Sequence, residues 1–227
     1  MRVYSCFLPC RRNSQRVPSK NVKKFGNGNA CLLSLKLDQL LEVDLFSEIV
    51  VSTDDERVKE ISLTYDSTRV KVIDRDPKLA LATTRLQDLI LHASQVVKAD
   101  HVFWTHVTSP FCGSSIYSSA IAAYERSLQN GKDSLMSVEV MREYVLFEGK
   151  ALNFDLGDEK WPPTQSLTPI HKVNNAIFIN SRVNYMKYKD RVGKNPFLFE
   201  MTGLSSLDID DPEDFDLAAN LYSNHVC

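Results

Sequence analysis

Four cationic side chains follow an apolar stretch near the start of the chain. Residues 7–21, FLPCRRNSQRVPSKN, contain Arg11, Arg12, Arg16 and Lys20 but no acidic residue. Arginine offers a planar fork of donors and lysine a compact point charge, and both groups bind phosphate oxygens. A solvated surface loop is the alternative, but such a loop normally mixes in Asp or Glu. The segment therefore predicts a phosphate-binding loop.

Two aspartates near the other end of the chain have the spacing of a metal site. Asp208 and Asp210 lie two positions apart in a segment expected to be extended (206–210), so both side chains project to one face. Neighbouring carboxylates repel unless a cation lies between them, and Mg²⁺ prefers oxygen ligands that it shares with substrate phosphates. Asp211 is better explained as a helix cap, because Pro212 suits the first helical position. We expect Asp208 and Asp210 to bind Mg²⁺.

Other motifs for phosphate binding or covalent catalysis are weaker. The sequence has no G-x-x-x-x-G-K-[ST] motif, and GNGNAC (26–31) lacks both the third glycine and the preceding strand of a dinucleotide-binding loop. Cys10 and His106 suggest a thiol nucleophile with its base, but no third group to orient them is evident. We expect Cys10 to be a buried packing residue.

Composition places the chain among ordinary globular proteins. It has 227 residues, 43% hydrophobic and 25% charged, and we expect one domain over 1–227. A net charge of −2 argues against nucleic acid as a partner. The five cysteines are odd in number and lack C-x-x-C spacing, which favours reduced thiols and a cytoplasmic protein. No apolar run approaches the length of about 18 residues that a membrane span needs, and no signal-peptide pattern is present, so no membrane partner is expected.

The first half of the chain alternates strand and helix patterns. Strands are predicted at 3–8, 48–53, 70–73 and 101–107, and helices at 31–41, from Thr53 or Asp54 to about 65, at 84–98 and at 114–129. This alternation implies right-handed crossovers and an α/β fold with a mainly parallel central sheet. Ligands bind beyond the carboxyl ends of such strands. We therefore expect the loops at 9–21, 74–84 and 107–114 to lie side by side.

The pattern changes after about residue 133. Strands are predicted at 134–140 and 175–180, and a closing helix at 212–222. Residues 142–172, which are rich in Trp, Pro and Asn, are expected to form an insert rather than a second domain. Trp161 and its apolar neighbours are typical of an exposed anchor for a partner surface. A lid packed on its own subunit is the alternative.

Five segments resemble, in order, the cytidylyltransferases that activate sialic acid and related 3-deoxy-2-ulosonic sugar acids, including the pseudaminate, legionaminate and Kdo enzymes. They are LPCRRNSQRVPSKN (8–21), VVSTDDERVKEIS (50–62), THVTSPF (105–111), VNNAIFI (173–179) and SLDIDDPEDFDLA (206–218). The resemblance spans essentially the whole chain. It implies a Rossmann-like nucleotidyltransferase fold, a small inserted dimerisation arm and a homodimer.

The resemblance also implies a reaction. CMP would pass from CTP to the anomeric hydroxyl of the sugar acid, pyrophosphate would leave, and no covalent enzyme intermediate would form. Catalysis would rest on alignment and charge neutralisation. Arg12 and Lys20 would act on the triphosphate, and Asp208 and Asp210 would hold Mg²⁺ against it. The implied CTP-binding residues are Pro9, Arg11, Arg12, Asn13, Ser14, Arg16, Lys20, Asn21, Arg75 and Thr83.

The implied sugar site comes from three regions of the chain. A sugar carboxylate needs a cation, and Lys172 and a protonated His106 are the candidates. A neutral, hydrogen-bonded His106 is the alternative. Arg75, in the loop that resembles the family's cytosine-binding loop, has an ion pair with Asp74 or Asp76 as its alternative role. The implied sugar-binding residues are His106, Thr108, Ser109, Gln165, Lys172, Asn174 and Phe178.

The chain departs from the family pattern at several positions. Gln15 replaces a lysine and Ala82 an aspartate, while Thr164 stands where an arginine is common; His106, Asn175 and Phe178 replace a glutamine, a glycine and a tyrosine. Several of these positions face the sugar in relatives, so they bear on which sugar is bound. Two alternatives remain. One is a nucleotide-sugar-dependent glycosyltransferase with an Asp-x-Asp motif, although that motif normally lies mid-chain. The other is a non-catalytic nucleotide-binding homologue, which Gln15 and Ala82 favour.

Overall fold

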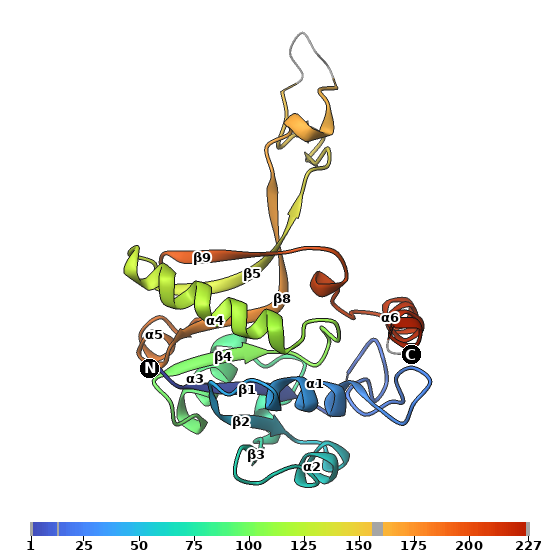
Figure 1. Ribbon diagram of the computed structural model, residues 1–227, viewed down its shortest axis with the longest axis vertical. Coiled ribbons are helices and arrows are strands. Elements are labelled where there is room, and N and C mark those ends of the chain that lie inside the picture. Colours follow the sequence, from blue (N-terminus) through green and yellow to red (C-terminus); the bar gives the residue numbers. More distant parts are fainter. Residues whose placement is uncertain (1, 13, 156–160, 226–227) are drawn as a thin grey trace.

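A seven-stranded sheet forms the centre of the protein. The computed structural model describes residues 2–12, 14–155 and 161–225 (Figure 1). The strands, in the order β3-β2-β1-β4-β8-β5-β9 across the sheet, are β1 (Tyr4–Cys10), β2 (Phe46–Thr53), β3 (Val70–Asp74), β4 (His101–Thr105), β5 (Ser134–Met141), β8 (Ile170–Ser181) and β9 (Pro196–Met201). Four pairings are parallel, and only the two that β8 makes with β4 and β5 are antiparallel. The predicted α/β fold with a mainly parallel sheet is confirmed.

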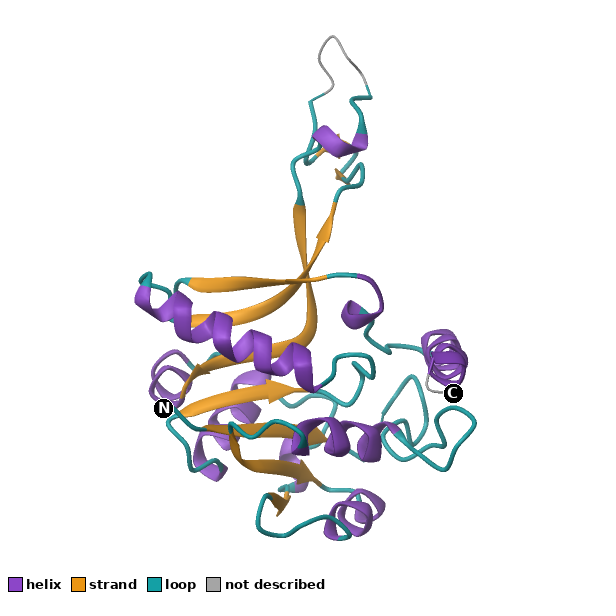
Figure 2. Ribbon diagram, viewed as in Figure 1, coloured by secondary structure: helices purple, strands orange, loops and turns teal. Residues whose placement is uncertain are grey.

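Helices cover both faces of this sheet (Figure 2). They are α1 (Leu32–Leu41), α2 (Glu56–Leu63), α3 (Leu86–Val96), α4 (Ser114–Gln129), α5 (Arg182–Tyr188) and α6 (Pro212–His225). The buried strand β1 shows why its sequence is continuously apolar. Cys6 and Leu8 pack in one core cluster with Ile121 of α4, whereas Phe7 packs on the other face with Ile90 of α3. No helix of the described residues is both long and apolar enough to cross a membrane.

A two-stranded arm projects from the sheet (Figure 1). The far ends of β5 and β8 remain paired past the end of β9, as far as Met141 opposite Ile170. Short strands β6 (Leu146–Phe147) and β7 (Lys150–Ala151) and the turn η2 (Thr164–Ser166) form its outer part. The insert predicted at 142–172 coincides with this arm, although β8 begins at Ile170 rather than at residue 175.

Three local predictions differ from the structure. Helix α2 is capped by Asp55, whose carboxylate accepts from the Arg57 backbone N–H, and not by Thr53 or Asp54. Helix α5 and strand β9 were not predicted. The segment at 206–210, expected to be extended, begins at the end of the turn η3 (Gly203–Ser206) and belongs to no strand; Leu207 is extended, and the Ile209 N–H donates to the Thr108 carbonyl at 2.8 Å.

Candidate active site

Three adjoining cavities lie at the carboxyl ends of β1, β2 and β4. We call them the loop cavity (230 Å³), the apolar cavity (270 Å³) and the outer cavity (440 Å³). Arg11 lines all three, so they form one continuous cleft. The loop cavity is lined by Pro9, Arg11, Ser14, Gln15, Arg16, Lys20, Asn21, His106, Val107 and Thr108. The predicted meeting of the loops at 9–21, 74–84 and 107–114 at this edge is confirmed.

The cationic loop is held in shape by its own polar contacts. The Arg12 backbone N–H donates to Asp54 Oδ1 at 2.8 Å, and the Asn21 amide donates to the Arg11 carbonyl at 3.0 Å. These bonds use the backbone of both arginines. Within the described residues, neither guanidinium makes a hydrogen bond or ion pair, and each lines at least one cavity. Unpaired cations at the mouth of a cleft attract an anionic ligand.

The two ends of the chain meet beside the loop cavity. Arg16 Nη2 lies 2.6 Å from Asp210 Oδ1, across 194 positions of sequence. Lys20 Nζ donates to the Ile209 carbonyl at 2.6 Å. Burial lowers the pKa of Lys20, and the nearby Asp208 and Asp210 oppose that shift. Both partners of the Arg16–Asp210 pair are more than half exposed, so the pair is weak and a ligand can displace it.

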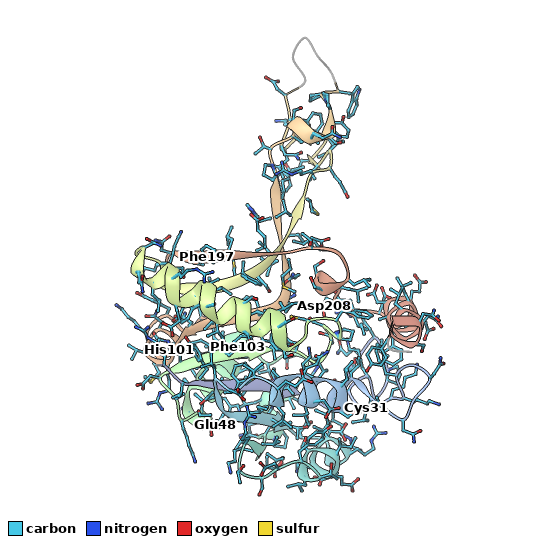
Figure 3. All side chains as sticks on the ribbon, viewed as in Figure 1. Cys31, Glu48, His101, Phe103, Phe197 and Asp208 are labelled. Atoms are coloured by element: carbon cyan, nitrogen blue, oxygen red, sulfur yellow. The ribbon has the colours of Figure 1, made fainter. Side chains whose placement is uncertain are left out.

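A fourth cavity of 420 Å³, which we call the acidic cavity, adjoins this junction. Asp208 and Asp210 both line it, together with Glu139, Lys172, Val173, Asn174, Asn175, Gly203, Ser206, Leu207 and Asp214. Figure 3 shows Asp208 on the segment that precedes α6. Asp208 Oδ1 is buried and receives no hydrogen bond from the described residues. Burial raises the pKa of Asp208, a hydrogen bond with Thr108 opposes the shift, and the Asp210 charge adds to it.

These carboxylates suit a shared metal rather than a closed protein cage. The described residues contain no group of three or more His, Cys, Asp or Glu side chains that could hold a metal ion. A Mg²⁺ ion needs only one or two protein carboxylates when phosphates and water supply its other ligands. The unpartnered Asp208 oxygen fits that requirement. Asp211 is instead a helix cap, as predicted, because its Oδ1 accepts from the Asp214 N–H at 3.0 Å.

Arg75 lines the apolar cavity and is only 3% exposed. Its Nε donates to Ser52 Oγ at 3.1 Å, and burial lowers its pKa. The alternative ion pair with Asp74 or Asp76 is not formed, since Asp74 pairs with Lys59 at 2.7 Å. Leucine and alanine side chains complete this cavity, which gives it a mixed character suited to a planar base. The other lining residues are Pro9, Arg11, Leu79, Leu81, Ala82, Thr84, Arg85, Leu86, Leu89 and His106.

His106 lies between the loop cavity and the apolar cavity, and it is neutral. Its Nε2 accepts from Trp104 Nε1 at 2.9 Å, so the ring proton is on Nδ1. Burial and the nearby cations, led by Arg191, lower the pKa of His106 to about 3. The expectation of a protonated His106 is wrong, and the neutral alternative is correct. Cys10 is buried, and burial raises its pKa to about 12, which argues against a thiol nucleophile and supports the packing role.

Three more of the predicted sugar-site residues line cavities, and two of these make internal polar contacts. Lys172 lines the acidic cavity, with its Nζ 3.6 Å from Glu139 Oε2. Asn174 lines it as well, although it is largely buried and accepts from Ser137 Oγ at 2.6 Å. Thr108 lines the loop cavity, whereas Ser109 is buried and its carbonyl accepts from Lys36.

Three further predicted residues line none of these cavities in the described structure, and a fourth lies outside the described residues. Phe178 is buried, and the Arg191 guanidinium covers its ring. Gln165 is exposed on the arm, in η2. Thr83 is exposed, but its neighbours Ala82 and Thr84 line the apolar cavity in its place. Asn13 lies outside the described residues.

The sequence interpretation missed three residues that shape the site. Asp54 fixes the cationic loop, Arg191 lies against His106, and Lys36 anchors the 109–112 loop. A lysine among the leucines of LLSLKLDQLL was the one available signal, because such a position on an apolar helix face is normally buried.

Comparison with known proteins assigns this chain to a class of enzymes. The profile of the family described as Cytidylyltransferase matches residues 5–227. The chain therefore belongs to the cytidylyltransferase family and is an enzyme of that class, which confirms the resemblance noted in its sequence.

Two named relatives show how the chain aligns within the family. It is 27% identical over 231 residues to the pseudaminic acid cytidylyltransferase of Campylobacter jejuni, covering 97% of each chain. It is 28% identical over 219 residues to the N-acylneuraminate cytidylyltransferase of Streptococcus agalactiae, where 92% of this chain matches 51% of the relative. The chain thus spans about half the length of the streptococcal protein.

Solved structures share the fold. The structure of CMP:2-keto-3-deoxy-manno-octonic acid synthetase complexed with CTP superposes with a TM-score of 0.68 at 15% identity, covering 98% of this chain and 99% of that one. A 4-diphosphocytidyl-2C-methyl-D-erythritol synthase from Anaerococcus prevotii gives a TM-score of 0.64 at 13% identity, covering 99% and 97%. The predicted nucleotidyltransferase fold is confirmed.

Proposed function

We propose that this enzyme transfers CMP from CTP to the anomeric hydroxyl of an acidic 3-deoxy-2-ulosonic sugar of the sialic or pseudaminic acid type and releases pyrophosphate. The observation that carries the proposal is the junction of the cationic loop with the paired aspartates. Arg16 reaches Asp210, and Lys20 reaches the carbonyl of Ile209. A triphosphate and its counter-ion fit such a junction of opposite charges.

The nucleotide would occupy the continuous cleft. Arg11, Arg12 and Lys20 would bind the triphosphate, since the two guanidinium groups have no partner within the described chain and Lys20 lines the loop cavity together with Arg11. Lys20 would offset the charge that develops on the leaving pyrophosphate. The cytosine would enter the apolar cavity beside Arg75, whose guanidinium is already held in place by Ser52. Preorganised donors of this kind require no rearrangement during reaction.

Asp208 and Asp210 would hold a Mg²⁺ ion. When bound, that ion would neutralise phosphate charge and polarise the phosphorus under attack. Asp208 supplies a buried oxygen that receives no hydrogen bond from the described residues. Asp210 would give up its exposed ion pair with Arg16 and bind the metal instead. The released Arg16 would then be available to the phosphates.

The acceptor would bind on the acidic side of the cleft. Lys172, Asn174 and Asn175 line that cavity, and Thr108, which lines the loop cavity, accepts from the Ile209 N–H. This position would bring a sugar hydroxyl towards the α-phosphate without any covalent enzyme intermediate. The class of sugar is inferred from the two relatives named above.

The arm would form a homodimer interface. Trp161 is 62% exposed, and its ring lies 5.2 Å from that of Tyr144 and 5.7 Å from that of Phe154. Leu146, Phe147 and Leu152 are also exposed nearby. An apolar surface of this kind on a projecting arm favours burial against a second copy of the chain. Gln165, on the same arm, would then contact the sugar of the partner subunit and not that of its own.

A pyrophosphate-release assay tests the proposal. Purified protein is given CTP, Mg²⁺ and a panel of 2-keto sugar acids, and the expected result is CTP-dependent release with at least one of them. Lys20→Met should reduce turnover by about 100-fold or more. The matched control is Lys24→Met, which removes an exposed lysine outside the cavities and should leave turnover unchanged.

Other outcomes would contradict the proposal. CTP binding without turnover on any acceptor would indicate a non-catalytic homologue. Breakdown of a CMP-sugar with transfer to a glycan would indicate a glycosyltransferase.

A further inference from the structure

The loop after α5 carries a guanidinium for which the sequence analysis assigned no function. Arg191 Nη2 donates to Asn175 Oδ1 at 3.0 Å, and its Nη1 lies 3.3 Å from His106 Nε2. Within the described residues no carboxylate lies at ion-pair distance from it, although Asp190 is its chain neighbour. Burying a cation without a counter-ion is unfavourable. An arrangement of this kind persists where a ligand supplies the missing negative charge.

Two aromatic rings fix the orientation of this guanidinium. Its central carbon lies 3.7 Å from the centroid of the Phe178 ring and 5.5 Å from that of Trp104. Trp104 and Phe178 are direct partners in the pairing of β4 with β8, so the two rings are themselves held rigidly. A planar guanidinium stacked on such a surface presents its donors in one fixed plane.

The two polar neighbours of Arg191 connect it to the cleft. His106 lines the loop and apolar cavities, and Asn175 lines the acidic cavity. Asn175 adopts φ +57°, a left-handed conformation that Asn and Gly tolerate better than other residues. The guanidinium therefore lies directly behind one residue of the nucleotide side and one residue of the acceptor side of the cleft.

The other two cations considered for the acceptor are less suitable. His106 is neutral, since its Nε2 accepts from Trp104 and its pKa is lowered to about 3. The Lys172 ammonium is largely exposed and already lies 3.6 Å from Glu139. Arg191 is the one cation of the three that is both partly buried and without a carboxylate partner in the described chain.

We propose that Arg191 is the residue that binds the carboxylate of the acceptor sugar, with Asn175 holding the guanidinium in position. This inference rests on the proposed function. In a 2-ulosonic acid the carboxylate carbon is bonded directly to the anomeric carbon. Fixing the carboxylate by a charge-assisted pair therefore also fixes the hydroxyl that attacks the phosphate.

The test compares an accepted sugar acid with its methyl ester, which lacks the negative charge. The wild-type enzyme should favour the acid over the ester by about 100-fold in kcat/KM, the value of one buried charge-assisted contact. In Arg191→Met this preference should fall to about 3-fold or less, while the KM for CTP changes by less than about twofold. Arg191→Lys keeps a charge without the fork and should retain an intermediate preference.

Two further variants make the comparison specific. Arg182→Met removes another arginine at the start of α5, away from the cavities, and should keep the full acid preference. Lys172→Met tests the rival cation. If Lys172→Met abolishes the acid preference and Arg191→Met keeps it, the inference is overturned.

Folding is checked by thermal melting and by CTP binding. If Arg191→Met does not fold, Arg191→Lys is used instead. An acid-over-ester preference of Arg191→Lys within about twofold of that of the wild type then overturns the inference. Absence of pyrophosphate release from the wild-type enzyme with every keto acid overturns the proposed function and this inference with it. Wild-type turnover with an unchanged acid preference in Arg191→Met overturns this inference alone.

Discussion

Asp208 carries a buried carboxylate oxygen that receives no hydrogen bond from the described part of the chain. Such an atom destabilises the folded state, because its hydration is lost without replacement. Proteins keep groups of this kind at sites where a ligand completes the bonding. The cleft is therefore less stable without its ligand than with it.

Replacing this carboxylate should separate stability from activity. In Asp208→Asn, pyrophosphate release should fall by about 1,000-fold, because one proposed metal ligand is lost. The melting temperature of the metal-free protein should instead rise by about 2–4 °C, since a buried anion is removed. The measurements are a pyrophosphate assay and a thermal melt with and without Mg²⁺ and CTP. Asp210→Asn serves as the control, because Asp210 is exposed and its loss should give no such rise.

His106 should make the stability of the protein depend on pH. Its pKa is about 3 in the folded protein against an ordinary value of 6.5, so below about pH 6.5 the unfolded chain binds a proton that the folded protein does not. Stability is therefore lost as pH falls from about 6.5 towards 3. Between pH 7.5 and 5.5, the unfolding free energy of the wild type should drop by about 1 kcal/mol more than that of His106→Gln. Urea titrations at both pH values measure this difference, and equal drops would contradict a neutral His106.

The sequence could predict one half of the site and not the other. A run of cations without acids and two aspartates two positions apart are local patterns, so the loop and Asp208 with Asp210 were identified. Arg191 was missed because its setting depends on Phe178 and Trp104, which become neighbours only when β8 pairs with β4. The lowered pKa of His106 was also not predictable, because it depends on burial and on the nearby Arg191, which only the folded protein brings together.

At the scale of elements, α1 fixes the loop between β4 and α4 through one buried lysine. Lys36 is fully buried, and its Nζ donates to the carbonyls of Ser109 and Cys112 at 2.8 and 2.9 Å and contacts the Tyr117 hydroxyl. These bonds fix the loop between β4 and α4, whose Thr108 lines the loop cavity. The position of the loop therefore depends on a residue that never touches the cleft.

Lys36→Met should destabilise the protein by about 3 kcal/mol, because three buried acceptors lose their donor. Urea unfolding measures the loss. Lys24→Met, which removes an exposed lysine, should change stability by less than about 0.5 kcal/mol. A loss for Lys36→Met no larger than that for the control would mean that the 109–112 loop does not need this anchor.

Elements with a clear helical period or a run rich in β-branched residues were predictable, whereas α5 and β9 were not. The helix expected at 31–41 is observed at Leu32–Leu41, and the strand expected at 70–73 at Val70–Asp74. Helix α5 has only 7 residues and β9 only 6, and β9 begins with Pro196. Proline is tolerated at the first residue of an edge strand, which only the assembled sheet reveals.

At the scale of the whole molecule, the arm exposes apolar side chains that the body of the protein does not cover. Trp161→Ala should therefore shift a homodimer towards monomer, with the dissociation constant rising by about 30-fold or more. Analytical ultracentrifugation over a range of concentrations measures the change. The control is Val183→Ala, which truncates an exposed apolar side chain on α5, away from the arm, and should leave the dissociation constant unchanged. A monomeric wild-type protein would contradict the proposed arm interface.

The ion pair between Arg16 and Asp210 has a consequence for how the protein is made. It joins segments 194 positions apart, so translation must come close to the last helix before the second wall of the cleft exists. A nascent or truncated polypeptide carries the arginines of the first segment without the aspartates that face them. Turnover should therefore require synthesis beyond residue 210, and a stop before residue 208 should leave a polypeptide that has the cationic loop without the proposed metal ligands.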